Sequence, residues 1–294
     1  MNKFFGSKVS IFIFAFPALL LFTAFVVYPL IPQIVISFQE HDGFAMHRWV
    51  GFDNYVETLT SKNFWSAEKN TMIIVLISIF VALPISLFLA LVLDSQSERI
   101  RRFFKAAILF PAVLSVTVIS QMWVAIYDPK WGALNSILRS MGLDAWTRSW
   151  LSEKDTVMYC IAFAFLYQYI GLNALLFYSG IKSIPKSYFE AARIDGAGFM
   201  AASIRITIPL LQEVIKYVLV ISTLGSMGLY SYIRVMTSGG PGRLSRTVVY
   251  EMFFTAFSKS NFGLGSAIAV LFVLQCLFVS FVINRYIARD KITY

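Results

Sequence analysis

Long apolar runs separated by shorter polar segments dominate the hydropathy pattern of this 294-residue chain. About 20 consecutive apolar residues in a helix are enough to cross a hydrocarbon core of about 30 Å. Six segments reach that length. They cover residues 11–37, 70–93, 106–127, 156–181, 209–233 and 263–285. The pattern therefore predicts an all-α integral membrane protein with six transmembrane helices.

The composition agrees with a membrane domain, because 58% of the residues are hydrophobic and only 14% are charged. A soluble domain carries roughly 25% charged residues. We expect one six-span domain over residues 11–285, preceded by a short segment (1–10) and followed by a tail (286–294). Pro29 and Pro32 lie inside the first span, where they predict a kink or a tilt.

Lys and Arg are distributed unevenly among the segments that join the spans. If the N-terminus is cytoplasmic, these residues are roughly twofold denser in the cytoplasmic segments than in the external ones. The positive-inside rule then places both termini in the cytoplasm. It also accounts for the net charge of +9 without a nucleic-acid partner.

Motifs for nucleotide binding, metal binding or nucleophilic catalysis are missing from the sequence. It has no G-x-x-x-x-G-K-[ST] loop and no G-x-S-x-G elbow. His41 and His47 stand in a predicted external loop and make a poor metal site. Cys160 and Cys276 lie inside apolar runs, which favours buried thiols over a disulfide or a zinc site. We expect no catalytic residue, metal or cofactor on this chain.

The segment between the fourth and fifth spans is too polar for a membrane and too regular for a loose loop. Ser187 followed by Glu190 predicts a capping box, and Gly196 predicts the left-handed residue that ends a short helix. A second amphipathic stretch, residues 199–207, stops near Pro209. The pattern predicts two short cytoplasmic helices that either lie on the membrane surface or dock a soluble partner.

This segment resembles the EAA motif of ABC importer permeases, E-A-A-x3-G-x9-I-x-L-P. Three further elements resemble the carbohydrate-uptake branch, the maltose and multiple-sugar type. The EAA match is Glu190-Ala191-Ala192, Gly196 and Ile206-Thr207-Ile208-Pro209, with Ile208 in place of leucine. The further elements are Gly51-Phe52-Asp53-Asn54-Tyr55, Ser179-Gly180-Ile181-Lys182-Ser183-Ile184-Pro185 and Thr237-Ser238-Gly239-Gly240-Pro241.

The resemblance implies a type I ABC importer transmembrane domain whose coupling segment, residues 187–209, contacts an ATPase subunit. The residues that it implies for this contact are Glu190, Ala191, Ala192, Asp195 and Gly196. It also implies a second homologous permease subunit, two ATPase subunits that bind ATP and Mg, and an extracytoplasmic solute-binding protein. The location that it implies is the cytoplasmic membrane of a bacterium or archaeon.

Polar side chains inside the spans are candidates for the solute pathway. Uncharged amides and hydroxyls near aromatic rings suit a polyhydroxylated solute, although the same groups also serve helix–helix packing. Gln168 is the first candidate. The full set is Gln168, Asn173, Tyr167, Ser222, Ser226, Tyr230, Gln275 and Gln121.

The expected cargo is a sugar or an oligosaccharide, with glycerol phosphate or a polyamine as the alternative within the same architecture. We expect no carboxylate, His or Lys at the midplane of a span, and Glu213 and Lys216 can pair near an interface. An ion-coupled carrier or a channel, which needs buried ionisable groups or an ion cage, is therefore the more distant alternative.

Overall fold

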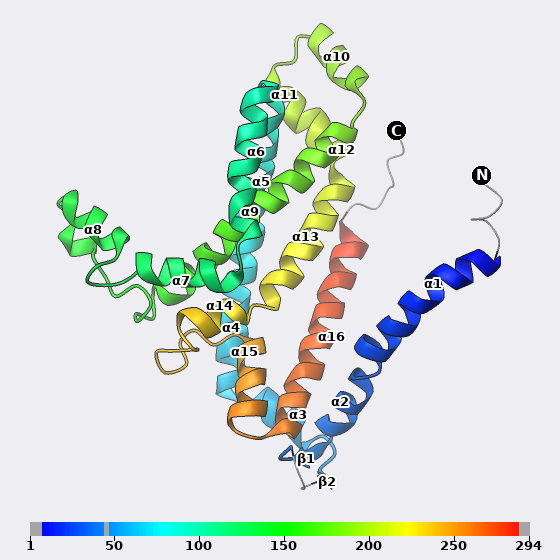
Figure 1. Ribbon diagram of the computed structural model, residues 1–294, viewed down its shortest axis with the longest axis vertical. Helices are drawn as coiled ribbons and strands as arrows, with labels where there is room; N and C mark the ends of the chain where they lie inside the picture. Colours follow the sequence, from blue (N-terminus) through cyan, green and yellow to red (C-terminus); the bar gives the residue numbers. More distant parts are fainter. Residues whose placement is uncertain (1–7, 44–46, 288–294) are drawn as a thin grey trace. The chain divides into compact units, whose positions relative to one another are not determined.

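The computed structural model describes residues 8–43 and 47–287 and is built almost entirely of helices (Figure 1). Five helices in this part of the chain are long and apolar enough to span a membrane, and a bent helix pair makes a sixth if it counts as one span. The five are Phe14–Ser37, Lys62–Ser95, Val157–Ser183, Gln212–Met236 and Phe262–Tyr286. The predicted end segments fall mostly outside the described residues, since 1–7 and 288–294 are not among them.

The chain forms two compact units, which we describe one at a time. The first holds residues up to 62 and 251–273, and the second holds 63–250 and the residues from 274 on. The first unit contains α1 (Lys8–Phe22), α2 (Leu30–Ser37), β1 (Gln39–His41), β2 (His47–Trp49), α3 (Asp53–Thr60) and the beginning of α16 (Phe262–Tyr286). The second contains α5 (Leu83–Ser95), α6 (Glu98–Val113), α7 (Val116–Ile126), α8 (Ala133–Ser140), α9 (Val157–Ser183), α10 (Lys186–Ile194), α11 (Phe199–Ala202), α12 (Ile208–Leu210), α13 (Gln212–Met227) and α14 (Ser231–Met236). Helices α4 (Lys62–Ile77) and α15 (Val248–Phe253) cross the division.

The first span loses its regular α-helical hydrogen bonding just before Pro29, within a helix that runs from Phe14 to Ser37. The predicted kink or tilt stays a prediction. A wide turn over Thr23–Val27 follows α1, and α2 starts directly after Pro29. Tyr28 donates its backbone N–H to the Thr23 carbonyl five residues earlier, at 2.8 Å. Pro32 lies in the first turn of α2, where a missing N–H costs little. Pro29 therefore marks the interruption, and Pro32 is accommodated.

The Gly51-Phe52-Asp53-Asn54-Tyr55 element fixes the end of this span within the first unit. Asn54 donates from Nδ2 to the carbonyls of Ser37 and Gln39, both at 2.9 Å. The Tyr55 hydroxyl lies 2.6 Å from Ser37 Oγ. The element therefore satisfies carbonyls that the end of α2 leaves open.

Strands β1 and β2 pair antiparallel. The described residues contain no cluster of three His, Cys, Asp or Glu able to hold a metal.

The core of the second unit lies where α5, α9 and α13 meet. Leu83, Phe177, Leu211 and Val218 are all buried in it. Helices α6 and α9 approach closely, because a Cβ on Gly171 would overlap the Ile108 carbonyl. Small and apolar side chains thus hold these helices together, as is usual inside membranes.

The predicted third span is not one straight helix. It begins at Glu98, well before residue 106, and α6 and α7 meet at 95°. Pro111 lies in the last turn of α6, and Leu114 and Ser115 then adopt extended backbone. Ser115 Oγ accepts a hydrogen bond from the Val118 N–H at 3.3 Å and so caps α7. The proline and the serine cap together explain why the helix stops and restarts.

Candidate functional site

The polar segment between α9 and α13 folds as the two short helical stretches that the sequence predicts (Figure 1). The second stretch runs from Phe199 through Pro209 to Leu210. The predicted capping box, however, is wrong. Pro185 has extended backbone (φ −57°, ψ 135°) and is the N-cap of α10, so Ser187 is already inside the helix and forms no cap hydrogen bond. The helix therefore starts two residues earlier than a Ser187 cap would require.

The end of α10 matches the prediction for Gly196. Its φ is +74°, in the left-handed region that glycine tolerates. The Ala197 N–H donates to the Ala192 carbonyl at 2.8 Å, and the Gly196 N–H donates to the Arg193 carbonyl at 3.1 Å. These two bonds form a Schellman C-cap, which turns the chain back toward α11.

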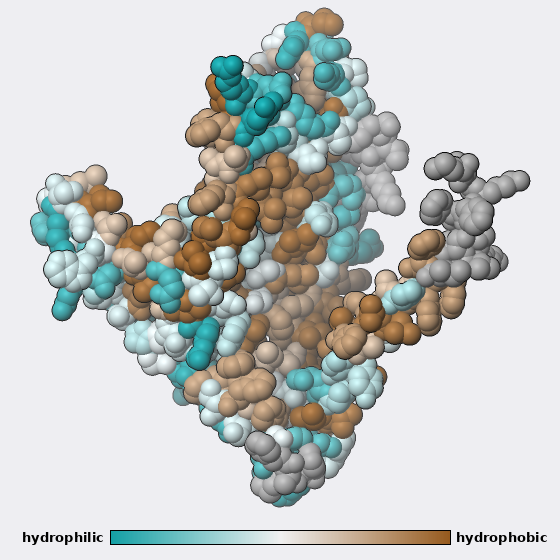
Figure 2. Space-filling model, in the orientation of Figure 1, coloured by the Kyte–Doolittle hydropathy of each residue, from teal (hydrophilic) through white to brown (hydrophobic). Residues whose placement is uncertain are grey.

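Four of the five residues predicted to contact a partner are exposed, namely Glu190, Ala191, Asp195 and Gly196. The fifth, Ala192, is only 7% exposed. Large apolar side chains surround them, and the most open is Ile194, which is 87% exposed. The others are Tyr188, Phe199, Met200 and Ile204. Hydrophilic side chains also gather around α10 (Figure 2). Such a mixed surface is typical of a docking site.

A groove of about 700 Å³ separates α10 and α11 from the ends of α5 and α9. Its walls carry apolar side chains together with charged ones. The charged residues are Asp94, Lys182, Lys186, Glu190 and Arg193. This groove lies beside the contact that Phe189 of α10 makes with the core of the second unit.

The first solute candidate, Gln168, is buried and has both ends of its amide engaged. Nε2 donates to the Leu114 carbonyl at 2.8 Å, and Oε1 accepts a hydrogen bond from the Tyr232 hydroxyl. Leu114 is the residue at which α6 breaks, so this amide satisfies a carbonyl that the break frees. A solute contact by Gln168 stays a prediction.

The remaining candidates fall into buried and accessible groups. Asn173 donates to Ser222 Oγ at 3.0 Å, and Ser226 donates to the Ser222 carbonyl at 2.8 Å, all within the helix interface. Gln121 is exposed, and Tyr167 is 39% exposed. Asn173, Ser222 and Ser226 therefore serve helix packing, whereas Gln121 and Tyr167 are accessible.

Two candidates contact residues that were not predicted. Tyr230 stacks on Tyr250, with ring centroids 5.7 Å apart. Gln275 donates from Nε2 to Glu68 Oε1. The predicted second span began at residue 70 and excluded Glu68, but the helix begins at Lys62. This carboxylate therefore belongs to the span and lies against the middle of α16. The predicted pairing of Glu213 and Lys216 is confirmed at 2.9 Å.

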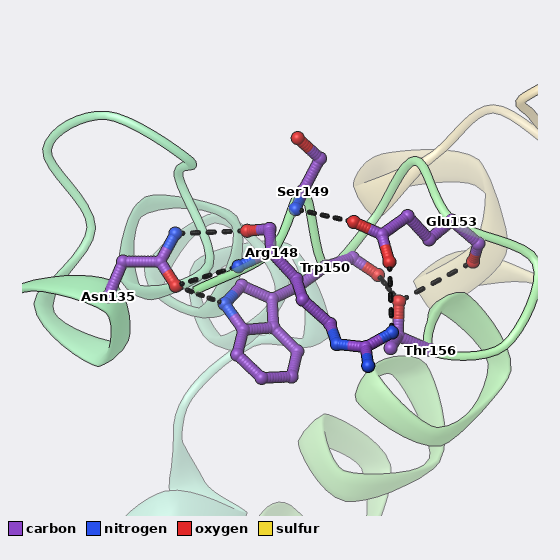
Figure 3. Close-up of polar contacts among 6 residues, drawn as sticks. All are labelled: Asn135, Arg148, Ser149, Trp150, Glu153 and Thr156. Carbon is purple, nitrogen blue, oxygen red and sulfur yellow. Dashed lines mark hydrogen bonds and ion pairs between the residues drawn. The ribbon is translucent and has the colours of Figure 1, made fainter. Parts of the chain in front are cut away.

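A second organised segment, residues 128–156, joins α7 to α9 at the opposite end of α9. Asn135 is 1% exposed, and its amide makes four hydrogen bonds, of which those to Arg148 and Trp150 are drawn in Figure 3. Nδ2 donates to the carbonyls of Pro129 (3.1 Å) and Arg148 (2.9 Å). Oδ1 accepts from the Arg148 N–H (3.3 Å) and from Trp150 Nε1 (2.7 Å). One side chain thus ties together both arms of the loop.

Further side chains brace the same loop. Glu153 accepts from the Ser149 N–H at 2.9 Å and pairs with Arg148 at 3.3 Å (Figure 3). Hydrogen bonds from the backbone N–H groups of Trp131 and Lys130 hold the pKa of the Asp128 carboxyl below its usual range. This network is not predictable from the sequence, because its bonds join residues of a loop that has no periodic pattern.

The described residues thus form a multi-span membrane domain with an exposed helical segment at one end. The chain belongs to the family described as binding-protein-dependent transport system inner membrane component, whose model matches residues 72–292. A probable ABC transporter permease protein of Pyrococcus horikoshii is 33% identical over 92% of each chain. The arabinooligosaccharides transport system permease protein AraP of Bacillus subtilis is 30% identical over 96% of this chain and 89% of the relative.

A solved structure shares the fold. It is a bacterial ABC transporter involved in the import of the acidic polysaccharide alginate. The match has a TM-score of 0.83, covers 93% of both chains and has 21% sequence identity. The predicted membership of the ABC importer permeases and the predicted all-helical membrane fold are confirmed.

Proposed function

We propose that this chain forms half of the translocation pathway of an ATP-driven importer for a sugar or oligosaccharide. In this proposal a second homologous permease supplies the other half. Two ATPase subunits bind on the cytoplasmic side, where both termini also lie, and an extracytoplasmic binding protein delivers the solute. ATP hydrolysis takes place on the ATPase subunits, and this chain contributes no catalytic group.

The observation that carries the proposal is the exposed helix α10. Glu190, Ala191, Asp195 and Gly196 form its open face, and exposed apolar side chains flank them. Ala192 supports this face from behind. A helix so exposed at the end of a membrane span is expected to be covered by a soluble subunit.

The connection of α10 to the spans suggests how movement is transmitted. The helix follows α9 after only two residues, and the stretch that ends at Leu210 leads directly into α13. Closure of an ATPase dimer that holds α10 therefore pulls on both spans together. Rocking of such helices alternates access to a site between the two sides of the membrane.

The cargo assignment rests on chemistry and on the relatives. The candidate pathway residues are uncharged, and amides or hydroxyls beside aromatic rings suit sugar hydroxyls and sugar ring faces. Gln121 and Tyr167 are accessible as they stand. Gln168, Asn173, Ser222 and Ser226 would need to exchange an internal hydrogen bond for one to the solute. Glycerol phosphate and polyamines are the alternatives that a transport assay must separate.

Two matched glycines provide the test of α10. Gly196 and Gly142 have φ values of +74° and +73°, and nothing lies within 4 Å of a Cβ added at either. Gly196→Trp and Gly142→Trp therefore impose the same backbone strain, and each directs a bulky side chain into open space. We expect only Gly196→Trp to lower ATPase-subunit binding and ATP-dependent uptake, by about tenfold or more.

The measurement uses the complete transporter in vesicles, with ATP inside and the loaded binding protein outside. Co-purification of the ATPase subunits reports assembly, and labelled oligosaccharide, glycerol phosphate and polyamine report cargo. Normal uptake by the Gly196 variant, or an equal loss in the Gly142 variant, would refute the docking role. Uptake of only an anion or a polyamine would refute the sugar assignment.

A further inference from the structure

Basic side chains surround the end of α5 next to the root of the coupling segment. Lys182, the penultimate residue of α9, places Nζ 2.5 Å from Asp94 Oδ1 on α5. Lys105 of α6 lies over the Tyr178 ring of α9, 3.8 Å from its centre, and Lys182 lies 5.5 Å from the same centre. These contacts join α5, α6 and α9 at one level, close to where α10 begins.

Arg101 completes this arrangement from α6. Its Nε donates to the Leu93 carbonyl at 3.1 Å, and Nη2 donates to the carbonyls of Asp94 (3.3 Å) and Gln96 (2.6 Å). A helix end leaves its last carbonyls open and carries partial negative charge, so a guanidinium suits this position. The end of α5 is thus fixed to α6 as well as to α9.

The location of the ion pair suggests a mechanical role. Lys182 precedes the first residue of α10 by four positions, and Asp94 and Lys182 both line the groove behind α10. In the middle of α10, Phe189 packs against the core of the second unit. At its root, a movement of α10 reaches the bundle where Lys182 meets Asp94.

We propose that Asp94 and Lys182 are positioning residues that make α5, and through Arg101 and Lys105 also α6, follow the root of α10. This inference rests on the proposed coupling function and extends it to a helix that does not connect to α10 along the chain. The two side chains are 31% and 47% exposed, so solvent screens them and the pair contributes little to static stability. We therefore expect the ion pair to affect how ATP hydrolysis is coupled to transport, and not how the chain folds.

The test is a charge exchange in the complete transporter in vesicles. The variants are Asp94→Lys, Lys182→Asp and the double exchange. We expect each single variant to keep its ATPase subunits but to move roughly fivefold less solute per ATP hydrolysed, because attraction becomes repulsion. The double variant should recover most of the loss. A role limited to packing predicts no such recovery, whereas an effect of net charge alone predicts the same losses in the single variants of the control pair described next.

A nearby ion pair provides the control. Glu98 and Arg102 lie 3.0 Å apart on α6 alone, and both are more than 80% exposed. Glu98→Lys and Arg102→Glu should leave the solute transported per ATP unchanged. Wild-type coupling in the single variants at positions 94 and 182 would overturn the proposal. So would a double variant no better than the singles, or loss of ATPase-subunit binding.

The same preparation separates this inference from the proposed function. If Gly196→Trp loses its ATPase subunits while the charge exchanges leave coupling intact, α10 docks the ATPase and only the positioning role fails. If Gly196→Trp transports normally, the docking role fails first. The two proposals are therefore tested by different variants.

Discussion

The two polar segments at the ends of α9 contain similar helices in different surroundings. Helix α8 has eight residues and α10 has nine. Each ends in a Schellman cap: Leu143 N–H donates to the Leu138 carbonyl at 2.9 Å, and Ala197 N–H donates to the Ala192 carbonyl at 2.8 Å. The backbone therefore ends both helices in the same way.

The side chains differ. Asn135, Glu153 and Thr156 bind the loop around α8 through side-chain hydrogen bonds (Figure 3). Among the residues that the structure describes, no side chain from Lys186 to Ala202 makes a hydrogen bond or an ion pair. A backbone cap ends a helix but does not attach it to its neighbours. Polar side chains therefore brace the loop at one end of α9, whereas α10 at the other end is held by apolar contacts such as that of Phe189.

The largest effect is expected from Asn135→Ala, because it removes four hydrogen bonds from a buried position. The local free energy of opening of the loop 128–156 should fall by about 2–3 kcal/mol. Hydrogen exchange at the Arg148 amide, which donates to Asn135, measures this change. Asn284→Ala, at an exposed position near the end of α16, is the control and should leave that exchange unaltered. Unchanged exchange in the Asn135 variant would show that the network does not brace the loop.

A smaller loss of stability is expected when alanine replaces either of the two cap glycines, and the loss should be the same at both positions. Gly142→Ala and Gly196→Ala should each cost about 1–2 kcal/mol, because both require left-handed backbone and neither Cβ meets a neighbour. Exchange of the Leu143 and Ala197 amides, which close the caps, reports the two costs. A difference above about 1 kcal/mol would mean that the surroundings, and not the caps alone, decide where these helices end.

The smallest effect is expected from Ser187→Ala. The side chain is exposed inside α10 and caps nothing, so the stability of α10 should change by less than about 0.5 kcal/mol. A true N-cap serine would cost about 1 kcal/mol. Hydrogen exchange at the Phe189 and Glu190 amides distinguishes a capping Ser187 from one that caps nothing. A loss of about 1 kcal/mol would contradict this interpretation and would indicate that Ser187 does cap α10.

Features that depend on a few adjacent residues were predictable from the sequence. The apolar runs identify the spans, Pro29 marks the interruption of the first, and Gly196 marks the end of α10. The capping box failed because Pro185 also controls where α10 begins. Glu68 was missed because a span continued past its apolar core into polar residues.

Features that depend on distant partners were not predictable. Pro111 is a visible helix breaker, but the donor that satisfies the Leu114 carbonyl after it is Gln168, 54 residues away. The Asn135 network joins backbone groups to a side chain 13 residues away and leaves no periodic signal. The Asp94–Lys182 contact requires the ends of two helices to meet. None of these pairings follows from hydropathy.

The Leu114 carbonyl also bears on how the chain enters a bilayer. An unsatisfied carbonyl in hydrocarbon costs several kcal/mol, and its donor, Gln168, is on the next span to be synthesised. We therefore expect the third span to take its bent form only after α9 has been inserted beside it. On this expectation, the bend of the third span and the insertion of α9 are linked through one amide.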